Sequence, residues 1–220
     1  TAAHTLKTRT MVSKIHHFHI CFISNKQIFN SSNFFFGCLK FNGCTILDNI
    51  TIPETVTVIG NSAFTNCKKL KKITIPASVT SIGHYAFNGC TGLKTLELED
   101  GEGELTLGNN KYNEYGEDKG LFRDCPIEEL YLGRNIDYLE YSDTSADVDY
   151  GSYGYSAFGN IQSASISVII GPKVTKIQSY SFYGCAGLSK VTINGDITSI
   201  GSNAFNGCTI LDNITIPETV

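Results

Sequence analysis

Residues 56–67 read VTVIGNSAFTNC, and residues 79–90 read VTSIGHYAFNGC, a second copy 23 positions later. A period of this length is typical of proteins built from stacked units, because one short unit cannot bury its apolar side alone. Further copies occupy 174–185 and 197–208, with weaker ones around Phe122 and Phe158. The repeat therefore predicts a solenoid that starts near Phe41 and runs to residue 220.

A second block follows the repeated cysteine and alternates apolar with polar residues, as in Ile73-Thr74-Ile75 and Val191-Thr192-Ile193. Alternation with period two is typical of a strand with one buried side. We expect seven such strands to stack about 4.8 Å apart. A second extended piece of the type Val-Thr-x-Ile follows, and the Ala-Phe-x-x-Cys stretch is expected to form a short helical or 3₁₀ turn.

The complete pattern, Cys-x-x-Leu-x-x-Ile-x-Ile-Pro-x-x-Val-x-x-Ile-Gly-x-x-Ala-Phe, resembles the BspA-like (Treponema-type) leucine-rich repeat over residues 41–220. The resemblance implies a leucine-rich-repeat solenoid, mainly β with short 3₁₀ or helical turns, built of right-handed stacked repeats of about 23 residues. Members of this family are largely surface proteins of host-associated bacteria and protists that serve in adhesion. The resemblance thus implies an extracellular or cell-surface location and non-enzymatic binding of a protein partner, such as a host extracellular or surface protein.

Composition excludes several other classes of protein. The chain has 220 residues, of which 41% are hydrophobic and 17% charged, so neither a disordered chain nor a charged coiled coil is expected. A net charge of -4 argues against nucleic acid as a general partner. No apolar run is long enough to predict a membrane-spanning segment. No nucleophile, Walker or dinucleotide motif stands in a suitable context, so we expect no enzymatic activity and no cofactor.

Residues 1–40 do not fit the repeat. They contain no acidic residue and hold four of the five histidines. We expect a degenerate repeat or cap, with a foreign extension as the alternative; a signal peptide is less favoured because histidines interrupt the apolar stretch. His17 and His19 would share one face of a strand, but no third metal ligand is marked, so an ordinary surface segment is preferred.

Six cysteines occupy the same position of the repeat. We expect them to point inward beside the phenylalanines as small apolar residues, rather than to form disulfides or a metal site. Cys21 and Cys38 lie outside this series and are able to pair with each other. The series consists of Cys44, Cys67, Cys90, Cys125, Cys185 and Cys208.

Residues 41–56 reappear letter for letter at 205–220. Identity that extends to positions expected to be exposed, such as Asp48 and Asp212, exceeds what packing requires. Recent duplication within a longer array explains it most simply, and we interpret the chain as a piece of a longer surface protein.

The middle of the chain differs from both ends. Most acidic residues lie between 97 and 149, and the spacing of the phenylalanines predicts insertions at about 99–120 and 137–155. More than half of the 11 tyrosines lie between 131 and 155. Asp143, Asp147 and Asp149 do not match a calcium loop, although a looser calcium site remains an alternative to a solvated loop.

Residues between the buried positions of each strand should face outward, and we expect a partner to contact those of the middle units together with the tyrosine-rich loop. A glycan-binding module, with tyrosines stacked on sugar rings, and a structural spacer are the alternatives. The candidate contact residues are Lys72, Glu97, Glu129, Tyr131, Arg134, Tyr138, Tyr141, Tyr150, Tyr153, Ile169 and Lys190.

Overall fold

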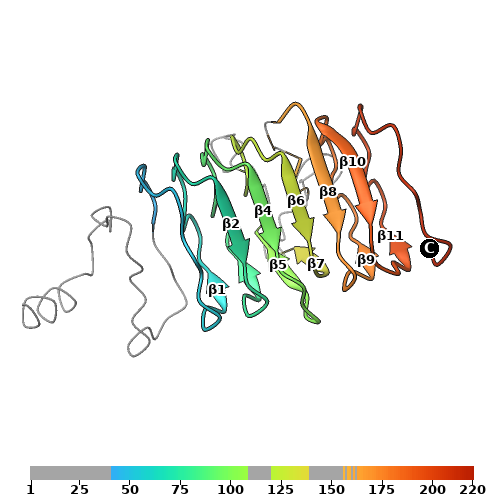
Figure 1. Cartoon of the computed structure of the whole chain (residues 1–220), viewed down its shortest axis with the longest axis horizontal. Helices are drawn as coiled ribbons and strands as arrows, with labels where there is room; N and C mark the ends of the chain where they lie inside the picture. Colours follow the sequence, from blue (N-terminus) through green and yellow to red (C-terminus); the bar gives the residue numbers. More distant parts are fainter. Residues whose placement is uncertain (1–40, 109–119, 139–155, 157, 160, 162) are drawn as a thin grey trace, which may run out of the picture.

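The structure is a computed structural model that describes residues 41–108, 120–138, 156, 158, 159, 161 and 163–220. The described chain winds into a stack of coils whose strands lie side by side along the stack (Figure 1). We number the coils 1 to 7 by the phenylalanines that open them: Phe41, Phe64, Phe87, Phe122, Phe158, Phe182 and Phe205. The seven rings stack face to face, with centroids of successive rings 5.1 to 5.7 Å apart. The predicted repeat therefore corresponds to one coil.

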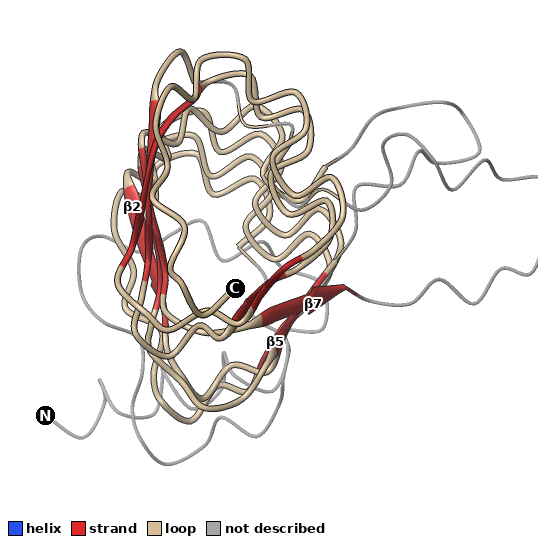
Figure 2. Cartoon of the chain, turned by 90° about the vertical axis from the view of Figure 1, so that its right-hand side faces the viewer, coloured by secondary structure: helices blue, strands red, loops and turns tan. Residues whose placement is uncertain are grey.

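One wall of the stack is a five-stranded parallel sheet, called the long sheet below, in the order β10-β8-β6-β4-β2. Its strands alternate between buried and outward residues, as the period-two pattern predicts. Figure 2 shows this wall at the left of the coils and the shorter strands at the lower right. The strands are β2 (Lys72–Ile75), β4 (Thr95–Leu98), β6 (Glu129–Leu132), β8 (Ile166–Ile170) and β10 (Leu188–Ile193).

The second extended piece of each coil forms the shorter strands, which divide into a four-stranded sheet, β1-β3-β5-β7, and a pair, β11-β9. Side chains bridge the gap between them: Asn135 Oδ1 accepts the amides of Thr175 and Lys176 at 2.9 and 3.1 Å, and Asp137 Oδ1 accepts Gln178 Nε2 at 3.0 Å. The strands are β1 (Val58–Ile59), β3 (Ser81–Ile82), β5 (Leu105–Leu107), β7 (Ile136–Tyr138), β9 (Lys176–Ile177) and β11 (Ser199–Ile200).

The Ala-Phe-x-x-Cys stretches are turns, and no described residue is in a helix, so the expectation of helical turns is wrong. The turns are closed by bonds between residues three apart, such as the Cys67 amide to the Phe64 carbonyl at 3.1 Å. A left-handed residue stands two places before and two places after the phenylalanine, as at Ser62 (φ 56°) and Asn66 (φ 61°) on either side of Phe64. Positive φ cannot continue a right-handed helix, so each turn stops after one bond.

The expectation of seven strands in one sheet is also wrong, because residues 49–51 and 213–215 are not strands. The Lys71 amide reaches the Asp48 carbonyl at 3.5 Å, which is too long for a good ladder bond. Alternation of apolar and polar residues therefore predicts which side faces inward, but a strand also requires a bonded neighbour.

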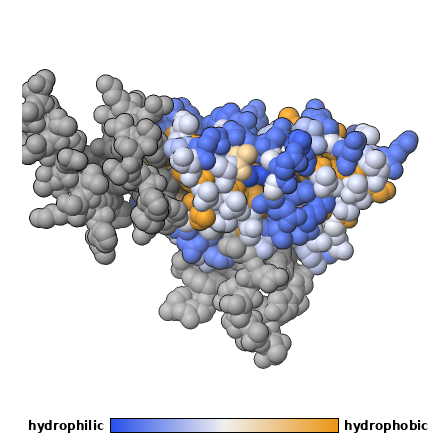
Figure 3. All heavy atoms as spheres, turned by 90° about the horizontal axis from the view of Figure 1, so that it is seen from below, coloured by the Kyte–Doolittle hydropathy of each residue, from blue (hydrophilic) through white to orange (hydrophobic). Residues whose placement is uncertain are grey.

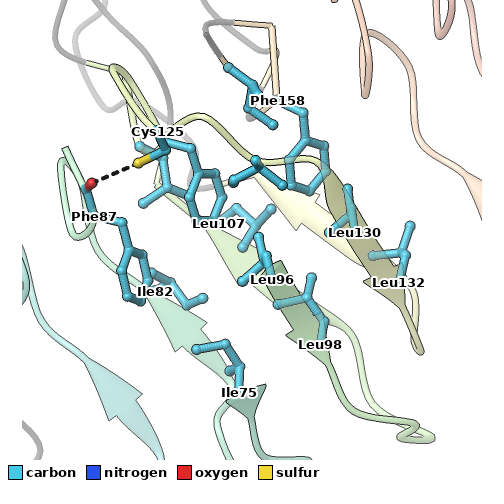
Figure 4. Packing of buried hydrophobic residues seen from close by; sticks show 14 of the residues in the cluster. Ile75, Ile82, Phe87, Leu96, Leu98, Leu107, Cys125, Leu130, Leu132 and Phe158 are labelled. Atoms are coloured by element: carbon cyan, nitrogen blue, oxygen red, sulfur yellow. Dashed lines mark hydrogen bonds between the residues drawn. The ribbon is translucent and has the colours of Figure 1, made fainter. Parts of the chain in front are cut away.

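The core lies between the two walls and contains the leucines, isoleucines, phenylalanines and cysteines of the repeat (Figure 4). Five of the six repeated cysteines are buried, and none of the described cysteines is in a disulfide. They do more than fill space, because their thiols donate to the phenylalanine carbonyl of the preceding coil: Cys67 to Phe41, Cys90 to Phe64, Cys125 to Phe87 and Cys208 to Phe182, at 3.0 to 3.2 Å.

The first predicted insertion begins with regular structure. Strand β5, within 99–120, pairs with β3 and β7, so these residues continue the ladder. Residues 109–119 of the first insertion and 139–155 of the second lie outside the described residues. Among the residues that the structure describes, no helix is long and apolar enough to cross a membrane.

Candidate interaction face

The outward residues of the long sheet form two columns that run along the stack. Parallel register places each residue directly beside its equivalent in the next coil. The prediction that the residues between the buried positions of each strand face outward is therefore confirmed for these five strands. The first column is Lys72, Thr95, Glu129, Ser167 and Lys190, and the second is Thr74, Glu97, Tyr131, Ile169 and Thr192. These ten residues are called the sheet face below.

Glu97 links the sheet face between coils 2 and 3. Its Oε2 lies 2.9 Å from Lys72 Nζ and accepts a 3.1 Å hydrogen bond from Thr74 Oγ1. The bond from Lys72 holds the pKa of Glu97 below its usual range. Neighbouring Thr95 donates to Glu129 at 3.3 Å, so polar contacts continue into coil 4. This end of the face is therefore charged and ordered by cross-strand pairs.

Tyr131 lies across the end of the neighbouring strand. Its hydroxyl donates to Asp100 Oδ1 at 2.7 Å. A side chain added at Gly171 would come within 2.6 Å of the Tyr131 hydroxyl, so glycine leaves room for this ring. Burial raises the pKa of Tyr131 to about 12, and the hydrogen bond to Asp100 adds to this effect. The ring is thus fixed at the hydroxyl end and offers its apolar side to the centre of the face.

Ile169 is the neighbour of Tyr131 in register. It is 40% exposed, and among the described residues the other exposed large apolar side chains all belong to coils 1 and 7. In coils 2 to 6, Ile169 is therefore the one large apolar side chain of the described chain that is exposed to solvent. Tyr131 and Ile169 together form a small apolar centre, with Glu129 and Lys190 in the adjacent column.

Arg134, one of the predicted contact residues, lies inside the stack and is 1% exposed. Its guanidinium donates to the carbonyls of Pro76, Ala77 and Val79 at 2.8 to 2.9 Å, which connects coil 4 to coil 2. A side chain used in this way cannot contact a partner. The prediction for Arg134 is therefore corrected: it is a structural residue. Its direction could not be predicted from the repeat, because the segment 133–135 is shorter than its equivalents.

Tyr138 also packs inward, in the column of Ile82 and Leu107. Burial raises the pKa of its hydroxyl to about 12. Tyr138 is only half-buried, but its ring belongs to the edge of the core and not to the sheet face. Three other predicted contacts, Tyr141, Tyr150 and Tyr153, lie outside the described residues.

The acidic loop 99–104 is tied to coil 5, a feature that the sequence did not reveal. Lys173 Nζ lies 2.6 Å from Glu102 Oε1, and Lys176 Nζ lies 2.7 Å from Glu104 Oε1. The ion pairs span coil 4 and neutralise part of the acidic charge predicted for this region. Seen from below, hydrophilic residues cover most of the described surface, and hydrophobic ones form small separate groups (Figure 3).

In the ranges that the structure describes, no group of three or more His, Cys, Asp or Glu side chains is placed to hold a metal ion. His17, His19, Asp143, Asp147 and Asp149, the residues weighed for metal binding, all lie outside those ranges.

Residues 14–142 and 147–220 match the BspA type leucine rich repeat region, in six copies. The chain belongs to this family. The match begins at residue 14, within the segment 1–40 that the sequence pattern sets apart. In the described part, one BspA-type unit contributes a phenylalanine turn, a buried cysteine and a strand to the stack. No curated protein matches the chain.

Three solved structures resemble the BspA-type chain. A leucine rich repeat protein of T. pallidum is 22% identical, with 72% of each chain covered and a TM-score of 0.39. A leucine rich cell surface protein of Faecalibacterium prausnitzii is 21% identical over 83% of this chain and 56% of that one, with a TM-score of 0.37. A leucine-rich repeat protein of Bacteroides ovatus is 24% identical over 82% of this chain and 70% of that one, with a TM-score of 0.27.

Proposed function

We propose that this chain is a non-enzymatic recognition module that binds a protein partner at the cell surface or outside the cell, through the sheet face. The observation that carries the proposal is the exposed Ile169 beside the fixed ring of Tyr131, in the middle of a sheet whose other outward residues are polar or charged. Membership of a repeat family whose members generally mediate interaction or surface recognition supports it.

The arrangement resembles the anatomy of protein interfaces, in which an apolar centre is surrounded by a polar rim. Aromatic anchors carry much of the binding free energy when they are held rigidly, because less side-chain entropy is lost on binding. The bond from Tyr131 to Asp100 provides this rigidity. The rim charges, Glu129 and Lys190, would then favour a partner with complementary charges and speed its association.

The proposal is tested by measuring binding of the purified chain to a panel of purified extracellular-matrix and host-cell surface proteins by biolayer interferometry. Ile169→Asp places a charge in the apolar centre and should weaken the tightest interaction at least tenfold. Thr106→Asp is the matched control, because Thr106 is the middle residue of β5, between two buried leucines, and faces outward on the other wall. It should leave the affinity within about twofold.

Binding that survives Ile169→Asp but is lost in Thr106→Asp would assign recognition to the other wall. A panel without any saturable binder would instead favour the structural spacer. Binding of neutral oligosaccharides, lost on Tyr131→Ala, would favour the glycan-binding module.

A further inference from the structure

A group of lysines precedes and begins strand β2 in coil 2, outside the apolar centre of the sheet face. Lys68, Lys69, Lys71 and Lys72 are all exposed, while Leu70 between them is buried. Leu70 thus anchors the segment and directs the lysines to solvent. The Lys71 carbonyl accepts the amide of Lys94 at 2.9 Å, so coil 3 adds a fifth exposed lysine beside the first four. These five residues are called the lysine cluster.

The other coils show that the fold does not require these charges. Positions equivalent to 68, 69, 71 and 72 are Thr45, Ile46, Asp48 and Asn49 in coil 1, and Ala186, Gly187, Ser189 and Lys190 in coil 6. Both coils form the same turn and stack on the same core. Four cations within five residues repel one another and so reduce stability slightly. Their presence in one coil alone is therefore better explained by a ligand than by folding.

Most of the positive charge in the lysine cluster is free. Lys72 pairs with Glu97 and Lys94 with Glu128, at 2.9 and 2.6 Å. Lys68, Lys69 and Lys71 have no ion pair among the described residues. The paired carboxylates, together with Glu129, form a negative border on the side of coil 4, so an anion would lie along the turn of coils 2 and 3 and not across the sheet.

We propose that the lysine cluster binds a sulfated polysaccharide. Lysines are flexible point charges and recognise charge density, whereas arginine forks recognise single planar anions. An exposed group of ammonium ions suits a linear polymer with many fixed charges, which binds mainly by releasing its counterions. The polymer class rests on the extracellular location in the proposed function, but the cluster is separate from Ile169 and is tested separately.

The probe is a heparin octasaccharide, titrated by calorimetry into the full chain at low and moderate salt. The variant Lys68→Gln/Lys69→Gln/Lys71→Gln should lower the affinity at least tenfold, and its binding should depend less on salt. Lys190→Gln removes one exposed cation elsewhere on the sheet face and should change the affinity less than twofold, as should Ile169→Asp. Glu128→Gln frees Lys94 and should strengthen binding.

Equal binding by the triple variant and the natural chain would overturn the proposal, as would an equal loss in Lys190→Gln. The desulfated octasaccharide and polyglutamate distinguish the ligand class: both should bind at least tenfold more weakly, and comparable binding by polyglutamate would reassign the cluster to acidic protein segments. Because the side chains of Lys68, Lys69 and Lys71 are exposed and have no ion pair among the described residues, circular dichroism of the triple variant should show an unchanged fold. The Ile169→Asp variant should still bind heparin. Failure of the proposed protein interface can therefore be distinguished from failure of the lysine cluster.

Discussion

Arg134 is the most deeply buried charged side chain among the described residues. Coils 2, 5 and 6 fill the corner after the long sheet with Val79, Val174 and Ile197. In coil 4 this corner is shortened to 133–135, and Arg134 reaches back to the carbonyls that follow strand β2 in coil 2. The guanidinium supplies charged donors to the carbonyls of Pro76, Ala77 and Val79, and that of Pro76 also accepts the Val79 amide at 3.1 Å.

Arg134→Met is expected to lower the free energy of unfolding by about 3 kcal/mol or more, because three carbonyls lose charged donors inside the protein. Urea denaturation followed by circular dichroism measures the change. Arg123→Met is the control, since Arg123 is partly exposed and its Nε lies 3.9 Å from Oδ1 of the neighbouring Asp124. This substitution should lower the free energy of unfolding by less than about 0.5 kcal/mol. Similar losses in both variants would show that the bonds of Arg134 contribute little.

The buried thiols predict sensitivity to alkaline pH. Burial raises the pKa of Cys185 from 9.0 to about 12 and that of Cys208 to about 11. Below pH 9 the folded and unfolded chains both keep these protons; above it the unfolded chain releases them first, so stability falls as the pH rises towards the folded values.

Cys185→Ala should therefore be less stable at neutral pH but lose less stability between pH 9 and 12. Urea midpoints across that range measure both effects. An unchanged slope would mean that Cys185 does not contribute to the pH dependence.

At the scale of the element, the coils approach one another so closely that some positions accept no side chain. A Cβ at Gly133 would lie 2.5 Å from the Asp100 amide nitrogen and from the Leu98 carbonyl oxygen, both in the backbone of coil 3. Nothing lies within 4 Å of a Cβ added at Gly103, in the loop of that same coil. Glycine at 133 thus sets the spacing between coils 3 and 4.

Gly133→Ala is expected to lower the free energy of unfolding by about 2 to 3 kcal/mol, because backbone cannot move aside as a side chain can. Gly103→Ala should leave it nearly unchanged. Thermal unfolding of the two variants in parallel measures the difference. Equal melting temperatures would contradict the close approach of the coils.

The sequence predicted the regular elements better than the irregular ones, for physical reasons. Alternation and period report which side chains face inward, so the phenylalanine stack, the buried cysteines and the two outward columns were predictable. Bonds between coils leave no such pattern: the bridge from Asn135, the direction of Arg134 and the loss of strands at 49–51 and 213–215 all depend on neighbours distant in the chain. The lysine cluster was visible in the sequence, but its significance appears only when coils are compared.

Along the described stack, groups of basic and acidic residues alternate. Coil 2 carries four of the five residues of the lysine cluster, and coils 3 and 4 carry the acidic loop and Glu129. Coil 5 contributes two lysines that pair with acidic residues of coil 3. The predicted acidic sector is thus partly neutralised within the fold. What remains distinct on the long sheet is the apolar centre at Tyr131 and Ile169, between acidic and basic neighbours.

The proposed recognition through this face is tested most directly by photo-cross-linking with the tightest binder of the protein panel. Benzoylphenylalanine is placed at position 169 in one chain and at position 106 in another, and adducts are resolved by mass spectrometry. An adduct is expected from position 169 and none from position 106. An adduct from position 106 alone would contradict it.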